Sequence, residues 1–405
     1  MKRPNLLLIL VDDMGFSDLG AFGSEIRTPN LDRLSKEGLR FRHFHATPVC
    51  SPTRAELMTG VDHHRTGLGN FPELRQDNQK NEPGYEGYLT DRVATIAERL
   101  KAAGYATFMS GKWHLGYDPR ANPAVRGFDR SFVLLGGGHN HFGRDPNYSA
   151  VIPNAGTVYT ENGQRVPTPQ PFYSTDYFTQ RAIDFLPEKG SDTPFFGYLA
   201  LTAPHFPLQA PKEDIARYAG KYDRGYEALR EERLARLKAL GFVAEDVEAH
   251  APSAPAPWAS LSPEQRKIEA RMMETYAAMV DRIDQNVGRL IDALKERIAA
   301  FACELAEELG AVDDSSALSW LDAIESEAVE ISNAVHAELV KQRSADRPAA
   351  AEESVCPECG RSGRYQGPRE RELIGRRGPL TIREPEYFCA CCRKSFFPAD
   401  PIDWR

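Results

Sequence analysis

The stretch Asn5-Leu-Leu-Leu-Ile-Leu-Val11-Asp12-Asp13 decides the fold class of this chain. Residues 6–11 are apolar at both parities, which is typical of a fully buried strand in a parallel sheet. Ligands of open α/β sheets bind at the carboxyl ends of the strands. Asp12 and Asp13 would lie at that edge, where adjacent carboxylates suit a hard cation such as Ca²⁺ or Mg²⁺. The alternative is that the two aspartates open a turn.

The composition is that of a globular chain. Its 405 residues are 41% hydrophobic and carry a formal net charge of -8, which excludes wholesale disorder and collagen-like repeats. No apolar run approaches the roughly 20 residues of a membrane-spanning helix, and the N-terminus lacks the pattern of a signal peptide. We therefore expect a cytoplasmic protein without a membrane partner. Nearly all the excess acid follows residue 297, which indicates two differently composed parts.

A helix and a second strand are predicted after the opening strand. Thr28-Pro29 is a helix start, with threonine as the cap and proline at the first helical position, and Gly38 is a stop. Residues Leu39 to His45 are predicted to form the second strand.

Cys50 lies in the most specific segment of the chain, Cys50-Ser-Pro-Thr-Arg-Ala-Glu-Leu-Met-Thr-Gly60. Pro52 and Arg54 after it indicate a reactive side chain at a helix N-terminus, where unpaired amides and the helix dipole favour an anion. The guanidinium adds a fixed positive charge. The alternative for a lone cysteine is a small buried hydrophobic residue.

Two further strands are predicted to bring polar blocks to the same sheet edge. A helix over Thr90–Lys101 precedes a strand over Tyr105–Met109, which leads to Gly111-Lys112-Trp113-His114-Leu115-Gly116. A buried strand over Pro194–Leu201 ends in Thr202-Ala-Pro-His205-Phe-Pro. The sequence thus predicts an α/β fold with a predominantly parallel or mixed sheet flanked by helices.

Loops and a long helix complete the first part. Segments 136–141 and 145–173 are rich in Gly, Pro and Asn, and we expect them to form loops over the site that select the substrate. Ser262-Pro-Glu-Gln265 is a capping-box start for a helix whose apolar stripe continues to Leu294.

The string Cys50-Ser-Pro-Thr-Arg54, followed by Thr59-Gly60, matches the signature of the sulfatases, and the blocks around Lys112 and His205 resemble further blocks of that family in order and spacing. The resemblance covers about three quarters of the chain. It implies a sulfuric ester hydrolase of the arylsulfatase type, in the alkaline phosphatase superfamily. In that family a formylglycine-generating maturation enzyme oxidises the cysteine, and the hydrated aldehyde supplies the nucleophilic oxygen.

Taken residue by residue, the resemblance implies the following roles. Asp12, Asp13 and the modified Cys50 would bind a divalent cation, commonly Ca²⁺. The other side chains would serve the sulfate ester substrate: Arg54 would hold the hydrate, Lys112 would bind sulfate oxygens, His114 would be the base for expulsion of sulfate, and His205 the acid for the leaving group.

The family pattern stops near Arg297. In sulfatases the long helix is followed by a strand ending in an Asp-Asn-Gly block that completes the metal site, and then by a C-terminal domain; no such block follows Arg297 here. We expect an incomplete domain over residues 1–297, with unpaired backbone groups beside the missing strand and weak or no turnover. The enzyme alternative is a phosphate or phosphonate ester hydrolase of the same superfamily.

The rest of the chain divides into an acidic helical segment, residues 298–342, and a cysteine-rich segment, residues 343–405. Cys356-Pro-Glu-Cys359 and Cys389-Ala-Cys-Cys392 are two Cys-x-x-Cys pairs, which suit tetrahedral Zn²⁺ in a zinc ribbon, with Cys391 as the spare. A redox pair is the alternative.

The cysteine-rich segment resembles the N-terminal region of certain insertion-sequence transposases, though it ends before any catalytic carboxylate set. Arginines between the cysteine pairs indicate a weak DNA contact, diluted by neighbouring glutamates. The sequence therefore predicts a fusion of a sulfatase-like part with a transposase fragment. The alternative to an enzyme is an inactive fusion whose only working part is a zinc-dependent DNA-binding ribbon.

Overall fold

The chain divides into two compact units, Met1–Glu304 and Leu305–Arg405, each considered by itself. The predicted three-part division at residues 297 and 342 stays a prediction. The structure, a computed structural model, describes residues 3–41, 44–80, 82–144, 157–188, 193–249, 256–308, 353–356, 359–375 and 378–396.

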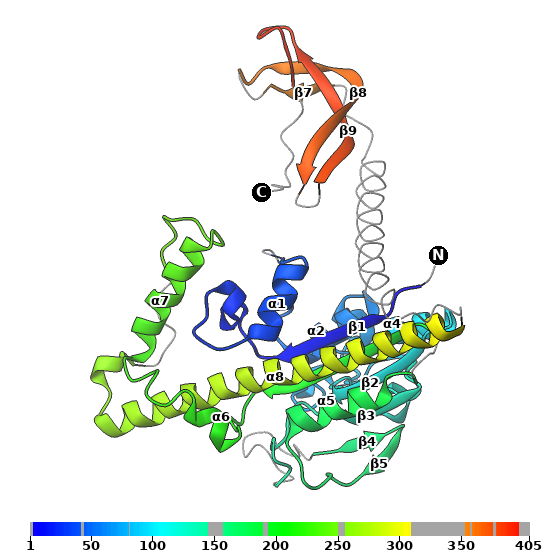
Figure 1. The fold of residues 1–405 in the computed structure, drawn as a ribbon, viewed down its shortest axis with the longest axis vertical. Coiled ribbons are helices and arrows are strands. Elements are labelled where there is room, and N and C mark those ends of the chain that lie inside the picture. The colour runs from blue at the N-terminus through cyan, green and yellow to red at the C-terminus, as the bar shows by residue number, and fades with distance from the viewer. Residues whose placement is uncertain are drawn as a thin grey trace. The chain divides into compact units, whose positions relative to one another are not determined.

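The first unit is built on a six-stranded sheet in the order β1-β6-β2-β3-β4-β5 (Figure 1). Strands β1, β6, β2 and β3 run parallel, and β4 and β5 are added antiparallel. This confirms the predicted α/β class with a mainly parallel sheet. The strands are β1 (Leu6–Asp12), β2 (Ala106–Lys112), β3 (Arg130–Leu134), β4 (Tyr159–Glu161), β5 (Gln164–Val166) and β6 (Phe195–Pro204).

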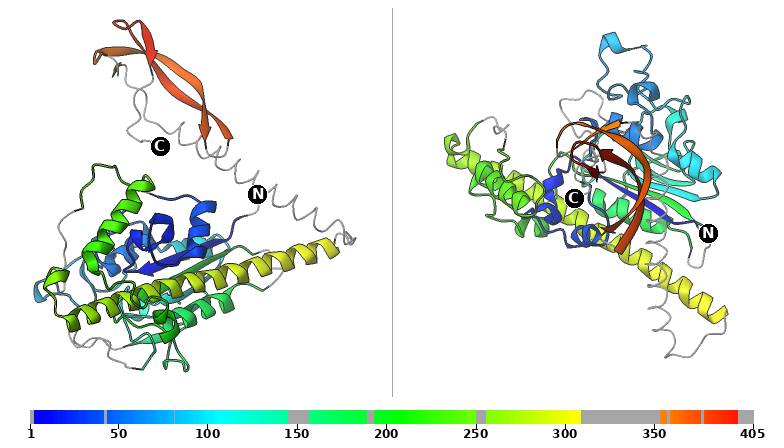
Figure 2. Two further views of the ribbon diagram at one scale, coloured as in Figure 1. Left: turned by 60° about the vertical axis from the view of Figure 1, so that its left-hand side comes forward. Right: turned by 90° about the horizontal axis from the view of Figure 1, so that it is seen from above.

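Helices cover both faces of this sheet, with α5 and α8 on one face and α2 and α4 on the other (Figures 1 and 2). Among the described helices, none is long and apolar enough to cross a membrane. The α-helices are α1 (Pro29–Glu37), α2 (Cys50–Thr59), α3 (His63–Thr66), α4 (Ile96–Ala102), α5 (Ser174–Phe185), α6 (Lys212–Ala216), α7 (Gly225–Ala239) and α8 (Pro263–Glu308). Short 3₁₀ helices span Phe16–Asp18, Gly20–Phe22, Asp77–Gln79, Pro119–Ala121 and Trp258–Ser260.

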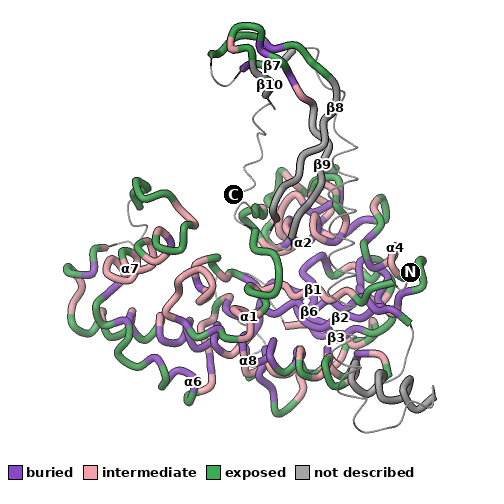
Figure 3. Tube along the Cα trace, turned by 45° about the horizontal axis from the view of Figure 1, so that its top comes forward, coloured by how far each residue is buried: buried purple, intermediate pink, exposed green. Residues whose placement is uncertain are grey.

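Strand β6 shows how the two faces share the core. Leu199 and Leu201 pack in the cluster with α5 and α8, whereas Tyr198 and Ala200 pack in the cluster with α2 and α4. This alternation follows from the two-residue period of a strand. Because both faces are covered, every residue of β6 is buried (Figure 3).

Strand β1 is less buried than predicted. Its residues are only partly buried up to Val11, because in the described part of the chain β1 pairs with β6 on one side and with no strand on the other. The predicted strand over Leu39–His45 is wrong for the residues that are described, 39–41 and 44–45, which form no strand. Leu39 and Phe41 are exposed, and no described strand offers this segment a ladder, so neither packing nor pairing holds it extended.

Several predicted boundaries shift. Helix α4 begins at Ile96 and not at Thr90, because Thr95 caps it reciprocally with Glu98. Strand β2 continues past Met109 to Lys112. Helix α8 begins as predicted, with Ser262 and Gln265 bonded to each other's backbone. Beyond residue 308, the rest of the acidic segment 298–342 lies outside the described residues.

The second unit contains an antiparallel sheet in the order β10-β9-β8-β7. Its strands are β7 (Glu353–Val355), β8 (Ser362–Gly375), β9 (Gly378–Cys389) and β10 (Lys394–Phe396). The long β8 and β9 form a hairpin. The first predicted cysteine pair begins at Cys356, directly after β7, and the second runs from Cys389 at the end of β9 to Cys392 before β10.

Gly111 near the end of β2 provides a test of the packing between β2 and β6. A Cβ atom on Gly111 would lie 1.9 Å from the Ala200 carbonyl oxygen, and the residue has φ +116°. We expect Gly111→Ala to reduce the free energy of unfolding by about 3 kcal/mol or more, from overpacking together with an unfavourable φ.

The matched control is Gly241→Ala, which also has positive φ but open space around its Cβ. It should cost only about 1–2 kcal/mol. Urea unfolding of both variants measures the difference, and equal losses would contradict the close approach of β2 to β6.

Candidate active site

Three neighbouring strands place the predicted site residues at one edge of the sheet. Asp12 ends β1, Lys112 ends β2, and His205 follows β6. Cys50 opens α2 beside them: the ligand atoms of Asp12, Cys50 and His205 all lie within 4.8 Å of one another. The structure therefore brings together residues that are far apart in sequence, at the carboxyl ends of parallel strands where such sheets bind ligands.

A buried cluster of three charges forms the centre of the site. Lys112 Nζ donates to Asp12 Oδ2 at 2.5 Å, and Arg54 Nη2 lies 3.2 Å from Asp12 Oδ1. All three side chains are at least 95% buried. Burial alone would raise the pKa of Asp12, but the charges of Lys112 and Arg54 outweigh it and hold the pKa well below the ordinary value. The carboxylate is therefore ionised at neutral pH.

Helix α2 is fixed against β2 by polar contacts as well as by packing. Arg54 Nη1 donates to the Lys112 carbonyl oxygen at 2.8 Å, and Ser51 Oγ donates to the His114 carbonyl oxygen at 2.5 Å. Gly60 ends the helix in the left-handed conformation that glycine favours. These contacts hold the first turn of α2, including Cys50, next to Lys112 and His114.

Cys50 lies at the N-terminus of α2, as predicted. Its side chain is only partly exposed, and burial raises the pKa of the Cys50 thiol above its ordinary value in spite of the nearby Lys112 charge. The thiol is therefore neutral at pH 7, and a neutral thiol is a poor nucleophile.

His114 is buried in a strained backbone conformation, with φ +57°. Its Nε2 lies 3.2 Å from Glu73 Oε2. Burial and the nearby Lys112 charge lower the pKa of His114 to about 4, although the Glu73 hydrogen bond opposes them. The imidazole is therefore neutral at pH 7, which is the state that a base requires.

His205 is held by the loop after β6. Its Nδ1 donates to the Phe206 carbonyl oxygen at 2.7 Å, and its Nε2 lies 3.6 Å from Asp13 Oδ2. Burial and the Lys112 charge lower the pKa of His205. Asp13 itself is largely exposed and has φ +63°.

The sequence did not identify four residues that support the site. Glu73 and Phe71 contact the His114 ring, and they lie in a loop without any motif. His139 Nε2 bonds Thr202 Oγ1 at 2.8 Å, and His141 Nε2 donates to the His205 carbonyl oxygen at 3.0 Å.

Segment 136–141 was predicted to select the substrate, and its histidines do not fit that role. His139 and His141 are each only 1% exposed, and burial lowers the pKa of both. They are neutral supports for the end of β6, because a histidine can bond two neighbours at once. The available signal was a Gly-rich motif with two histidines. Such a motif does not show whether the histidines are buried supports or line a substrate surface. Residues 145–156 of the other predicted loop lie outside the described residues.

The described residues supply only part of a divalent cation site. Asp12 and Asp13 are the acidic ligands predicted for it, and both oxygens of Asp12 already contact cationic side chains. Ca²⁺ takes six to eight oxygen ligands and Mg²⁺ takes six. The donors predicted from the sequence, Asp12, Asp13 and Cys50, therefore do not by themselves form a complete site for either ion.

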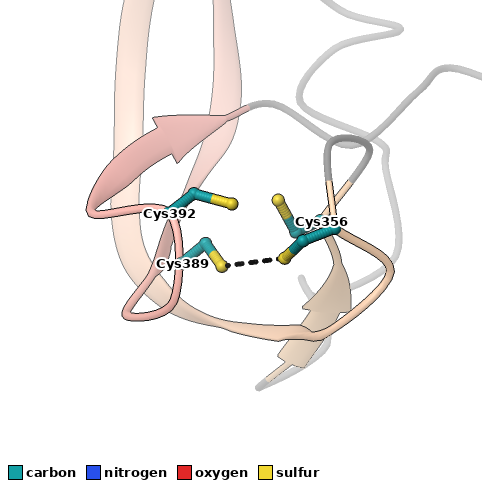
Figure 4. A group of neighbouring side chains, drawn as sticks. Cys356, Cys389 and Cys392 are labelled. Carbon is teal, nitrogen blue, oxygen red and sulfur yellow. Dashed lines mark hydrogen bonds between the residues drawn. The ribbon is translucent and has the colours of Figure 1, made fainter.

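A second candidate site lies in the second unit, where Cys356, Cys359, Cys389 and Cys392 converge (Figure 4). Their four sulfur atoms all lie within 4.8 Å of one another, and Cys359 Sγ is 3.6 Å from Cys389 Sγ. A backbone hydrogen bond from Gly360 to Cys356 closes the first turn. Cys391 is exposed and is not part of the group.

The buried charge cluster predicts a large and specific stability effect. Lys112→Met leaves the Asp12 carboxylate with one cation in place of two, and we expect a loss of about 3–5 kcal/mol in the free energy of unfolding. In the Lys112→Met background, the further change Asp12→Asn should lower the free energy of unfolding by less than Asp12→Asn does in the native chain. The pKa of Asp12 is held below its ordinary value of 3.8 in the native chain. The difference in the free energy of unfolding between the native chain and Lys112→Met should therefore shrink as the pH falls below that value.

Lys80→Met is the control, since it removes an exposed pair in which the side chain of Asp77 is 97% exposed. Such a pair contributes at most about 1 kcal/mol. Urea unfolding between pH 3 and pH 7 measures these effects, and additive losses for the Asp12 and Lys112 changes would rule out the coupling.

Comparison with known proteins agrees with this geometry. Residues 4–299 match the protein family described as Sulfatase. A protein of Schizosaccharomyces pombe named as an uncharacterized sulfatase is 47% identical over 309 residues, which are 73% of this chain and 55% of that protein. The arylsulfatase of Klebsiella aerogenes is 41% identical over 295 residues, which are 73% of this chain and 63% of that protein.

A solved structure is also similar to this chain. The crystal structure of Ps i-CgsB is 31% identical, with a TM-score of 0.52 over 73% of this chain and 55% of that one. The chain spans between half and two thirds of the length of these relatives. With the family match covering most of the chain and the signature residues gathered around Cys50, the chain belongs to the sulfatase family.

Proposed function

We propose that the chain is a sulfate ester hydrolase of the arylsulfatase type, whose nucleophile is a formylglycine made from Cys50 by a maturation enzyme. The observation that carries the proposal is the position of Cys50, at the start of α2 and within 4.8 Å of Asp12 and His205. The raised pKa of Cys50 is a further support, because the unmodified thiol is poorly suited to attack. A cytoplasmic location stays a prediction.

The hydrated aldehyde would supply the hydroxyl that attacks sulfur and, after the alcohol leaves, a second hydroxyl whose deprotonation expels sulfate. The residues around it have matching chemistry. Lys112 and Arg54 bring buried positive charge to the place where negative charge develops on the sulfate oxygens. His114 is neutral and would serve as the base. His205, whose pKa burial lowers, would serve as the acid for the leaving group in its protonated form.

A divalent cation, Ca²⁺ or Mg²⁺, would bind Asp12, Asp13 and the modified Cys50. It would neutralise charge on the sulfate group. Because these donors fill only part of the coordination shell of either ion and water would supply the rest, we propose that the cation binds weakly and that turnover is low.

A phosphate or phosphonate ester hydrolase is the alternative for the same residues. Phosphoryl and sulfuryl groups both spread negative charge over equatorial oxygens, so Lys112 and Arg54 suit either. Parallel assays with an aryl sulfate and an aryl phosphate on the same preparation distinguish the two.

The conversion of Cys50 is the direct test of the proposed nucleophile. The chain is co-expressed with a formylglycine-generating enzyme, and the Cys50 peptide is measured by mass spectrometry. We expect a loss of mass from this peptide, together with slow hydrolysis of the aryl sulfate that requires the converted residue.

Cys50→Ala is the control, since it cannot be converted and should be inactive while folding normally. Full conversion without any hydrolysis of either ester would refute the hydrolase proposal and leave the inactive fusion. Hydrolysis at ordinary sulfatase rates would refute only the proposed low turnover.

We also propose that the second unit binds one Zn²⁺ through Cys356, Cys359, Cys389 and Cys392. Four sulfurs around a tetrahedral Zn²⁺, each about 2.3 Å from the ion, lie roughly 3.8 Å apart. The 3.6 Å between Cys359 Sγ and Cys389 Sγ is close to this spacing, and the cysteines are free thiols. This arrangement favours a metal site over the redox pair. Whether the ribbon also contacts DNA stays a prediction, and the slope of binding against salt concentration would measure it.

Metal content tests the zinc site. The purified chain should contain one Zn²⁺, and Cys392→Ser should lose it because three thiolates bind more weakly than four. Cys391→Ser is the matched control and should keep the metal, since that thiol is exposed and outside the group. Equal zinc content in both variants would contradict the assignment.

A further inference from the structure

The contact between His114 and Glu73 is unusual because it is a buried pair of a histidine and a carboxylate that no motif predicted. The side chains are 4% and 11% exposed, and His114 Nε2 lies 3.2 Å from Glu73 Oε2. The other carboxylate oxygen, Oε1, accepts a hydrogen bond from the Tyr117 hydroxyl at 2.8 Å. Both oxygens of Glu73 are therefore held in place before any substrate arrives.

The His114 ring is fixed on both sides. Phe71 stacks on it with ring centroids 5.4 Å apart and an interplanar angle of 11°. Gly137 lies close to the ring edge, since a Cβ atom there would be 2.7 Å from His114 Cε1. The backbone is fixed as well, because the carbonyl oxygen of His114 accepts from Ser51 Oγ.

The partner of Nε2 determines which nitrogen carries the proton. An ionised carboxylate can only accept hydrogen bonds, so a neutral histidine must present Nε2–H to Glu73 and leave Nδ1 as the acceptor. Nδ1 of His114 is buried, and no group in the described residues makes a hydrogen bond with it. The one ring nitrogen that can take up a proton is thus the one without a partner among those residues.

We propose that Glu73 is a positioning residue that fixes His114 in the Nε2–H tautomer and thereby makes Nδ1 the atom that accepts the proton in the ester hydrolysis. The tautomer stands on the contact geometry alone. The role of Nδ1 in the reaction rests on the proposed function. Glu73 acts through His114 and does not itself contact the reacting atoms.

The tautomer is measured directly by nitrogen-15 NMR of the full chain labelled at histidine. A protonated ring nitrogen and an unprotonated one give well-separated resonances, and the His114 pair is assigned by its loss in His114→Asn. At pH 7 we expect Nε2 to be protonated and Nδ1 to be unprotonated. A protonated Nδ1 in the native chain would overturn the proposal, whether or not the chain hydrolyses any ester.

Glu73→Gln tests the cause of the tautomer. The amide can donate as well as accept, so we expect a mixture of both tautomers, and in the matured enzyme a kcat at least about tenfold lower with little change in KM. Glu82→Gln makes the same chemical change at an exposed position of the same loop region and should leave both measurements unchanged.

The outcomes separate the two proposals. If Glu73→Gln keeps the native tautomer and the native kcat, Glu73 does not position His114. If the matured native chain hydrolyses no ester, the proposed function fails, and the NMR comparison still decides the role of Glu73. Tyr117→Phe removes one support of the carboxylate and keeps the His114 contact, so it should retain the native tautomer.

Discussion

The buried contact between Asp12, Lys112 and Arg54 is the interaction on which the first unit depends. It joins the end of β1, the end of β2 and the first turns of α2, which are separated by up to 100 residues in the chain. A charge buried without partners would cost several kcal/mol. All three elements must therefore be in place before any of these charges is buried. The same contact that stabilises the sheet edge also gathers positive charge beside Cys50. Structure and proposed chemistry therefore share one set of side chains.

Much of this arrangement could be predicted from the sequence because it follows from local patterns. The apolar run before Asp12 predicted β1, and the segment beginning at Cys50 predicted the start of α2. Polar blocks after two further strands predicted that Lys112 and His205 share an edge with them, since parallel strands end on the same side. The four zinc-type cysteines were likewise visible from their spacing.

Other features depend on tertiary contacts that no local pattern encodes. Glu73 lies in an irregular loop, and only the folded chain brings its carboxylate to His114. Asp13 and His114 both have left-handed backbone conformations. Aspartate and histidine adopt positive φ more often than most other residues that have a side chain, but no local pattern marks which copies do so. The segment after Gly38 places Leu39 and Phe41 at alternate positions, as a strand can, yet whether it forms a strand depends on a partner and not on its own residues alone.

The open side of β1 has a consequence for how the chain behaves in solution. Natural sheets usually end in short, charged or covered strands, which prevents pairing with other molecules. Here the strand without a second neighbour among the described residues consists of Leu-Leu-Leu-Ile-Leu-Val before its aspartate. An apolar edge strand that pairs with no described strand on its outer side is a template for intermolecular pairing. Colloidal stability, more than the strength of the core, would then set the concentration at which this protein can be handled.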